Sequence, residues 1–289
     1  MGWIARRKLA AAVCNAGGLG IIETSSGEIE NCVEEIKAMP KLTDQPFGVN
    51  LPLMFLADDR MVNIVADAGV KFVTTSAGDP SKYIQILKDA NITVFHAVPS
   101  LKGALKAVDA GVDGLVVEGT EGGGFKASEE VGLHVLIQSI KKHTDIPIVA
   151  AGGIVDGRGM AAAFAAGAEG IQMGTRFVSS LESPVHNNYK NKIIESSEEG
   201  TFILNKKGRP CIRALKSNLT EEIYEKGVMD MSALGGIKNL YFEGDMEAAP
   251  ALAGQSIGLI DEVKPVKNII EETIAEFNAI CDAMPMAKL

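Results

Sequence analysis

Pro147-Ile-Val-Ala-Ala151 is an apolar run that leads into Gly152-Gly153-Ile154, and a second run, Gly170-Ile-Gln-Met173, leads into Gly174-Thr175-Arg176. Residues 156–166 between them begin with Asp156, a good N-cap, and stop before Gly167, which suits the left-handed conformation that ends many helices. The order is therefore strand, glycine turn, helix and strand. This order is typical of a βαβ unit, in which a helix joins two parallel strands.

Similar apolar or β-branched runs precede this unit at spacings of roughly 20–35 residues, the length of one strand, one helix and two loops. They are residues 19–23, 47–51, 71–76, 92–97 and 114–117. Helical patterns separate the runs, and short apolar strands of this kind are buried on both faces of a parallel sheet. We therefore predict an α/β protein.

Seven strands are one fewer than a TIM (β/α)8-type barrel contains, and the chain opens directly into a helical segment, residues 4–15. A barrel whose first strand is missing from this sequence explains both observations. The alternative is an open doubly wound sheet, but no Gly-x-Gly-x-x-Gly fingerprint stands between a strand and a helix. We expect the barrel, with its first strand upstream of Met1. A barrel without that strand would leave unpaired backbone groups on residues 19–23 and on the last strand.

Composition narrows the class of partner. With 28 Lys and Arg against 37 Asp and Glu the net charge is −9, and only 5% of the residues are aromatic. A nucleic acid backbone would be repelled and its bases would find few stacking partners, so we expect no nucleic acid partner. We also expect no membrane segment, because the uncharged residues 9–22 fall short of the ~20 residues of a span. Four cysteines without CxxC spacing suit a reduced, cytoplasmic protein with no metal site, while assembly as a homo-oligomer stays open.

The last two predicted strands point to a phosphate site. In barrels of this type the loops after strands seven and eight often hold a phosphate through backbone N–H groups. Gly152 and Gly153 follow one of these strands, and Gly174 and Thr175 follow the other, so that no glycine Cβ blocks an approaching phosphate. The loop 118–125 is richer still in glycine and would let a flat ligand lie against its backbone.

Together with other short motifs, these glycine loops resemble the FMN-dependent nitronate monooxygenases, also called 2-nitropropane dioxygenases, and the related FMN-dependent enoyl-ACP reductases. The motifs that carry the resemblance are Ala16-Gly-Gly-Leu-Gly20, Gly48-Val-Asn50, Gly119-Thr-Glu-Gly-Gly-Gly124, Ala150-Ala-Gly-Gly-Ile154, Gln172-Met-Gly-Thr-Arg-Phe177, Gly208-Arg-Pro210 and Ala253-Gly-Gln255. The resemblance runs along nearly the whole chain. It implies an FMN-binding barrel over residues 1–199, a small C-terminal lid over residues 200–262, and a final helix within 263–289 that returns to the barrel.

The resemblance also implies which residues meet the cofactor. Asn50 and Glu118 would contact the flavin ring or its ribityl chain, and the two glycine loops after the last strands would hold the phosphate. The implied cofactor-binding residues are Met1, Gly2, Asn50, Glu118, Gly119, Gly123, Gly124, Ala151, Gly152, Gly153, Gln172, Met173, Gly174 and Thr175.

The sequence departs from the family pattern where the chemistry is expected. Phe125 stands where the family's glycine loop usually ends in His, and a phenyl ring neither takes a proton nor donates a hydrogen bond. Phe125 would then be a wall for the substrate. Among the histidines, His96 closes the strand 92–97 and is the candidate catalytic group over the flavin, with a neutral, hydrogen-bonded histidine as the alternative. Arg176 would either neutralise phosphate or form an ion pair beneath its loop.

We therefore expect an FMN-dependent oxidoreductase with a small-molecule substrate. The first hypothesis is a nitronate monooxygenase that oxidises alkyl nitronates with O2, because nitronates are already ionised and need no base. The second is an NAD(P)H-dependent reductase of enoyl-ACP, other enoyl thioesters or quinones. The third, motivated by Phe125 and the missing strand, is a flavin-binding protein without turnover.

Overall fold

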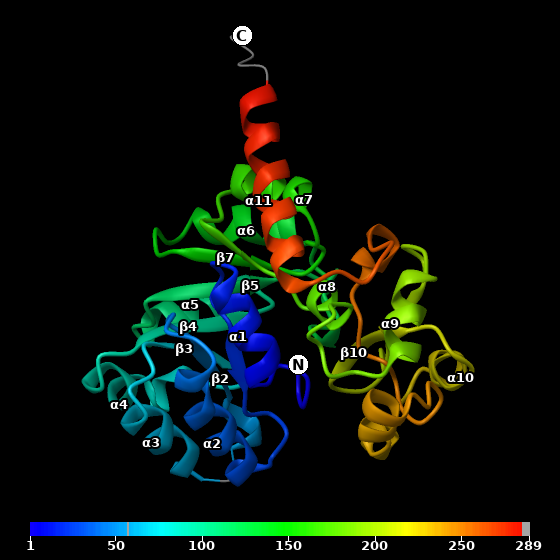
Figure 1. Cartoon of the computed structure of the whole chain (residues 1–289), viewed down its shortest axis with the longest axis horizontal. Helices are drawn as coiled ribbons and strands as arrows, with labels where there is room; N and C mark the ends of the chain where they lie inside the picture. The colour runs from blue at the N-terminus through cyan, green and yellow to red at the C-terminus, as the bar shows by residue number, and fades with distance from the viewer. Residues whose placement is uncertain (57, 285–289) are drawn as a thin grey trace.

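The computed structural model describes residues 1–56 and 58–284 and contains a parallel sheet of seven strands. Figure 1 shows helices packed around this sheet and a smaller lobe beside it. In spatial order the strands are β1 (Ile21–Glu23), β2 (Gly48–Pro52), β3 (Phe72–Ser76), β4 (Thr93–Val98), β5 (Gly114–Glu118), β7 (Ile148–Ala151) and β8 (Gly170–Gln172). All seven predicted strands are confirmed, each within two residues of its expected ends.

A helix lies in each connection between neighbouring strands of this sheet, as predicted, and further helices precede and follow the sheet. In chain order the helices are α1 (Arg7–Asn15), α2 (Ile29–Ala38), α3 (Arg60–Asp67), α4 (Ile84–Asp89), α5 (Leu101–Asp109), α6 (Leu133–Lys141), α7 (Gly157–Ala166), α8 (Thr175–Val178), α9 (Asn187–Ile194), α10 (Asn218–Lys226) and α11 (Val266–Ala283). Short helical turns add Met39–Lys41, Leu53–Phe55, Pro80–Lys82, Met231–Leu234, Asn239–Glu243 and Gln255–Leu259. No helix in the described part of the chain combines the length and apolar character that a membrane span requires.

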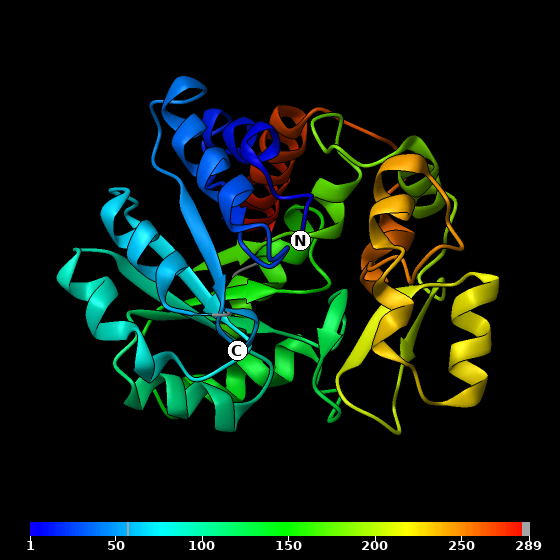
Figure 2. The same ribbon diagram turned by 90° about the horizontal axis from the view of Figure 1, so that it is seen from below.

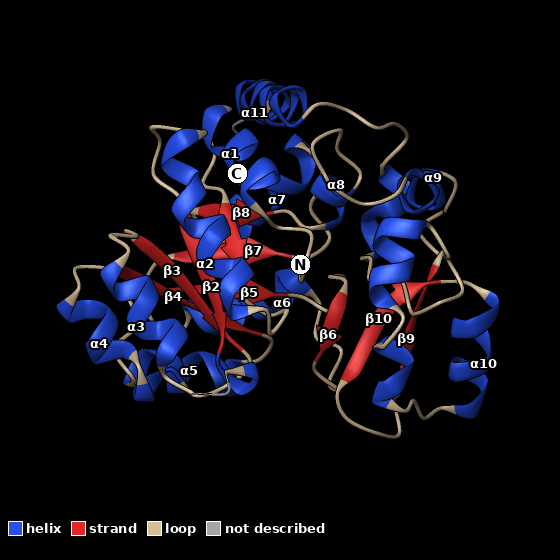
Figure 3. Cartoon of the chain, turned by 60° about the horizontal axis from the view of Figure 1, so that its bottom comes forward, coloured by secondary structure: helices blue, strands red, loops and turns tan. Residues whose placement is uncertain are grey.

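The sheet is of the TIM-barrel type, because its strands follow one another in chain order and all neighbours are parallel. A doubly wound sheet would reverse its order midway, which these strands do not. Figure 3 shows the sheet curling, with helices on its outer side. Its ends are β1 and β8, which are not paired with each other among the described residues. The N-terminal segment covers the β1 end, where the backbone N–H of Glu23 donates to the carbonyl of Ala5 at 3.0 Å.

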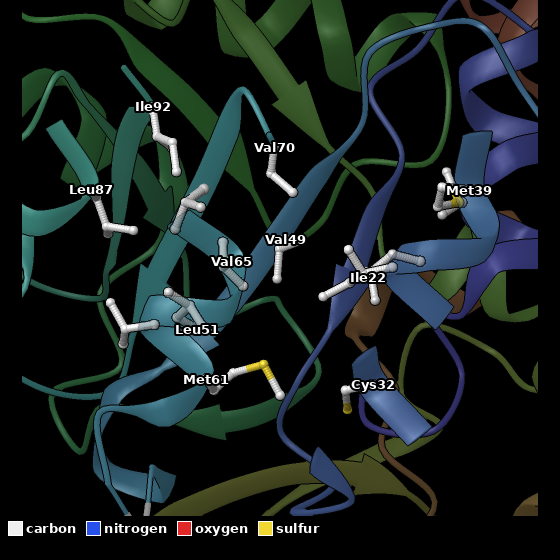
Figure 4. Packing of buried hydrophobic residues seen from close by; sticks show 14 of the residues in the cluster. Ile22, Cys32, Met39, Val49, Leu51, Met61, Val65, Val70, Leu87 and Ile92 are labelled. Atoms are coloured by element: carbon white, nitrogen blue, oxygen red, sulfur yellow. The ribbon is translucent and has the colours of Figure 1, made fainter. Parts of the chain in front are cut away.

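Side chains point alternately to the two faces of the sheet, one of which packs against the helices while the other faces the interior of the curl. Val49 and Leu51 of β2, and Val73 and Val94 of the next two strands, pack with side chains of α2, α3 and α4 in one apolar cluster (Figure 4). Residues of the opposite parity face the interior of the curl, where the rings of Phe72 and Phe95 lie 5.2 Å apart. The interior also needs small residues, since a Cβ on Gly114 would fall 2.3 Å from the Phe95 ring.

The smaller lobe holds a second sheet, here called the lid sheet, made of β6 (Gly124–Lys126), β10 (Cys211–Leu215) and β9 (Thr201–Leu204). Both of its pairings are antiparallel. Figure 2 shows this lobe, in yellow and orange, beside the barrel. The lid sheet therefore takes one strand from the loop that follows β5, outside the predicted lid of residues 200–262. Helix α9 also packs with lid residues in one apolar cluster, so the boundary predicted at residue 199 does not divide two separate cores.

Helix α11 packs on α7 and α1. The rings of Phe164 and Phe277 lie 5.1 Å apart across the α7–α11 contact. The two backbones are close at Gly157, where a Cβ would fall 2.4 Å from the N atom of Phe277, and the Gly157 N–H donates to a Glu276 carboxylate oxygen at 2.9 Å. Residues 285–289 of the predicted terminal segment lie outside the described residues.

Replacing Asp156 with Ala is expected to lower the free energy of unfolding by about 1 kcal/mol. The predicted N-cap is confirmed, because the Asp156 side chain accepts from the Gly159 N–H at 2.8 Å, and Gly167 ends the same helix at φ 111°. Urea denaturation of Asp156→Ala and Asp156→Asn tests this. Because Asn also caps helices, the Asn variant should keep most of the stability, and an equal loss in both variants would contradict a capping role.

Candidate active site

The interior face of the sheet brings several of the predicted cofactor residues together. Glu118, Ala151 and Gln172 are register partners at the carboxyl ends of β5, β7 and β8, so their side chains leave the sheet on the same side. They alternate with Leu115, Val117, Ile148 and Ala150, which pack among the outer helices. Glu118, Ala151 and Gln172 therefore face the interior of the curl, at the end of the sheet where barrels bind their ligands.

Asn50 joins this face from β2, since its parity is opposite to that of Val49 and Leu51. Its amide nitrogen donates to the Thr74 carbonyl at 3.2 Å, to the Thr74 hydroxyl at 3.0 Å and to the Ser76 hydroxyl at 3.3 Å. These bonds fix the amide plane and occupy the donor end. The carbonyl oxygen of the side chain is left as an acceptor for a ligand group that carries an N–H or O–H.

Two glycine turns lie side by side above β7 and β8. The backbone N–H groups of Gly152, Gly153, Gly174 and Thr175 have no hydrogen-bond partner among residues 1–56 and 58–284. Gly152 and Gly153 have φ values of +93° and +77°, so the turn itself explains these two glycines. Four free donors on adjacent turns form a cradle suited to an anion.

Gly174 is different, because nothing in the protein requires it to be glycine. Its φ is −106°, which any residue adopts, and the nearest heavy atom to an added Cβ is the Met1 sulfur at 3.8 Å. A Cβ here would fill open space within the cradle. A phosphate in that space accounts for the glycine, and the residues present therefore fit the phosphate that the resemblance implies. The same contact places Met1 beside the cradle.

The glycine loop after β5 packs onto these turns and onto the lid. The Gly119 N–H donates to the Ala151 carbonyl at 3.0 Å, and a Cβ on Gly123 would fall 2.6 Å from the backbone of Ala253. The lid is bonded to the cradle as well, since the Gly254 N–H donates to the Thr175 hydroxyl oxygen at 3.0 Å. Thr175 can therefore accept from the lid and donate its own hydroxyl proton to a phosphate oxygen.

Glu118 is engaged at the same point by a residue that sequence reasoning missed. The Lys126 ammonium on β6 forms an ion pair with the Glu118 carboxylate, and the Lys126 side chain is only 3% exposed. The strand β6 forms by pairing with β10, some 85 residues later in the chain. Nothing local in the sequence signals that pairing, which explains why Lys126 was overlooked.

An apolar rim lies beside this end of the barrel. The Phe125 ring is 5.9 Å from the Phe55 ring, measured between centroids, and the two side chains come from β6 and from the turn after β2. Phe55 is 52% exposed, Phe125 41% and the adjacent Met54 75%. Three exposed large apolar side chains at the mouth of a site are costly in water and suit an apolar ligand.

The structure does not place His96 over this face. His96 lies on the same side of β4 as Val94 and Val98, which pack against the outer helices, and it is the register partner of Thr75. Its Nδ1 atom lies 2.8 Å from the Thr75 hydroxyl, and the residue is 5% exposed. Because side chains alternate along a strand, His96 leaves β4 on the side away from Asn50 and Glu118. This is the alternative weighed above, a hydrogen-bonded histidine in the core.

A His96→Asn variant is expected to remove a pH dependence of stability. Burial lowers the pKa of His96 from its ordinary value of 6.5, although the charge of Asp79 opposes this. Below about pH 6.5 the unfolded chain then binds more protons than the native protein, so the wild type loses stability as the pH falls. Urea unfolding at pH 8 and pH 5 should show a larger loss for wild type than for His96→Asn. Equal losses would mean that His96 titrates alike in both states.

Two further residues take structural positions. Arg176 is 6% exposed and donates to the Glu262 carbonyl at 2.8 Å, and the acidic Asp261, Glu262 and Glu272 lie near it, so it lies beneath the loop rather than in the cradle. Glu121 accepts from the Leu133 N–H at 3.1 Å and so closes its loop, as expected for a carboxylate among glycines.

Comparison with known proteins agrees with this arrangement. The family model described as "Nitronate monooxygenase" matches residues 1–59 and 53–276. The structure of FabK from Thermotoga maritima is 40% identical, with a TM-score of 0.92 over 98% of this chain and 92% of that chain. A nitroalkane oxidase from Streptomyces ansochromogenes is 25% identical, with a TM-score of 0.87 over 98% and 95%. A curated relative from Rhodococcus jostii, (3aS,4S,5R,7aS)-5-hydroxy-7a-methyl-1-oxo-octahydro-1H-indene-4-carboxyl-CoA dehydrogenase, is 29% identical over 98% of this chain and 92% of its own length.

The family match covers more than nine-tenths of the chain, and the relatives that share its fold over nearly their full length bear the names of oxidoreductases. The chain therefore belongs to the nitronate monooxygenase family and is an oxidoreductase.

Proposed function

We propose that this protein is an FMN-dependent reductase of unsaturated acyl thioesters that takes its electrons from NAD(P)H. The cradle supports FMN as the cofactor, because it offers one set of four N–H donors and the sequence lacks a dinucleotide fingerprint. When bound, FMN would supply the two-electron chemistry that the side chains of this protein lack. Gly152, Gly153, Gly174 and Thr175 would hold its phosphate, while Asn50 and Glu118 would meet its polar groups.

The rim formed by Phe55 and Phe125 is the observation that favours an acyl substrate. An acyl chain laid against these rings would bury apolar surface on both partners, worth roughly 0.8 kcal/mol for each CH₂ group covered. A small alkyl nitronate covers little of it. One of the similar proteins points the same way, since the relative from Rhodococcus jostii is named for a carboxyl-CoA substrate.

The protein's own residues would bind and orient rather than exchange protons. Phe125 offers no proton and His96 lies on the other side of its strand, so the proton that reduction of a carbon–carbon double bond requires would come from solvent water. The Asn50 amide is held by Thr74 and Ser76, so its free oxygen is fixed before any ligand arrives. The lid contacts at Gly254 and Thr175 keep the cradle closed on one side.

Oxidation of alkyl nitronates by O2 is the second candidate, and one observation favours it. Neither Phe125 nor His96 supplies a base at the interior face, and an ionised nitronate needs none. A protein with this site would act on nitronates and leave neutral nitroalkanes almost untouched.

Anaerobic mixing of the FMN-loaded protein separates the proposals. We expect NADH or NADPH to bleach the yellow absorbance of the bound flavin rapidly. Bleaching by an alkyl nitronate but by neither nicotinamide would overturn the reductase and support the monooxygenase. Bleaching by none of the three would leave a flavin-binding protein without turnover.

A further inference from the structure

Lys126 is a deeply buried charge next to the proposed cofactor site, and nothing in the cradle or the rim uses it. Its side chain is 3% exposed, whereas the side chain of its partner Glu118 is 32% exposed. The cavity beside Lys126 measures only about 10 Å³ and is lined by Pro99, Thr120 and Val131 among others. That is room for one water molecule and for no substrate, so the ammonium can act only through Glu118.

The neighbouring charges do not replace it. Glu130, on the same cavity, is paired with Lys206 at 2.8 Å, and Glu121 accepts from the Leu133 backbone. The Arg213 guanidinium on β10 donates hydrogen bonds to the Thr120 carbonyl and the Thr201 hydroxyl, both at 3.0 Å. Burial lowers the pKa of the Met1 amino group and so disfavours its charged form, although the charges of Glu23 and Glu118 oppose this. Lys126 is therefore the one side-chain cation that the described residues place within ion-pair distance of Glu118.

We propose that Lys126 is a positioning residue that holds Glu118 at the carboxyl end of β5 and cancels its charge, so that this carboxylate can face an anionic cofactor. A bare carboxylate in the same site as a flavin phosphate would repel it, because the interior screens charges less than water does. The ion pair also ties β5 to β6 and so to the lid sheet. This inference rests on the proposed binding of FMN.

The test compares FMN with riboflavin, which is the same molecule without the phosphate. Apoprotein is titrated with each, and the ratio of the two affinities is the readout, because packing effects on the shared ring and ribityl chain cancel in it. Lys126→Met removes the charge and keeps the length, Lys126→Arg keeps the charge, and Glu118→Gln removes the opposite charge.

In Lys126→Met we expect the preference for FMN over riboflavin to fall about tenfold at low salt, and the loss to shrink at 1 M salt. Glu118→Gln should raise the preference, while Lys126→Arg and the double variant Lys126→Met/Glu118→Gln should stay near wild type. An unchanged ratio in Lys126→Met, or equal weakening of both ligands at every salt concentration, would overturn the proposal.

A variant that does not fold and a wild type that binds no flavin would give results different from those above. If Lys126→Met does not fold, the Glu118→Gln variant decides alone, and an unchanged ratio there contradicts the proposal. If wild-type protein binds neither FMN nor riboflavin, the proposed function fails.

Discussion

Gly174→Val is expected to give a folded protein that no longer holds FMN. The added side chain would occupy the cradle, where the nearest protein atom to a Cβ is 3.8 Å away, so the fold has room for it and the phosphate does not. Each N–H bond to an anionic phosphate contributes about 1.5–3 kcal/mol, so losing two should weaken FMN binding a hundredfold or more. Titration of the apoprotein with FMN measures the effect.

Thermal unfolding of the two apoproteins is the matched control. Because the backbone at Gly174 has φ −106°, valine causes no strain there, and the melting temperatures without FMN should agree. Added FMN should raise the melting temperature of wild type alone. A Gly174→Val protein that stays yellow after purification would show that the phosphate lies elsewhere.

Phe125→His is expected to create a reaction that the wild type lacks. An imidazole at the mouth of the site would give the protein a base, and general-base assistance is worth about 10²–10⁴-fold for a substrate whose carbon must lose a proton. Turnover of a neutral nitroalkane should therefore rise by that factor. Oxidation of the corresponding nitronate should change much less.

Phe125→Leu is the control, because leucine keeps the apolar wall and adds no base. It should leave neutral nitroalkanes unreactive while retaining activity on acyl thioesters. If wild type already oxidises neutral nitroalkanes efficiently, a base is present that the structure does not place at the interior face. In that case a loss of activity in His96→Ala would identify His96 as that base.

The barrel was predictable because its evidence is local. Each strand is a short apolar run, and the glycines at 152–153 and 174 follow two of them directly, so the sequence alone predicts where the cradle lies. The cap at Asp156 and the left-handed Gly167 are likewise short-range signals.

The side of the sheet on which His96 lies was harder to predict, because parallel strands are buried on both sides and polarity does not mark the interior. His96 shares one side of β4 with Val94 and Val98, yet only the packing of those valines against helices shows which side is outer. Phe55 and Lys126 carried no local signal at all. They become part of the site through the contact of the β2 turn with β6, and through the pairing of β6 with β10.

Reoxidation of the reduced, FMN-loaded protein by enoyl thioesters tests the central claim most directly. The protein is reduced anaerobically and mixed with trans-2-enoyl thioesters of increasing chain length, and the return of the yellow absorbance is followed. If the Phe55 and Phe125 rim receives an acyl chain, reoxidation should occur without O2 and should become more efficient as the chain lengthens. A reduced protein that reacts with none of the enoyl thioesters and is reoxidised only by O2 would contradict the account.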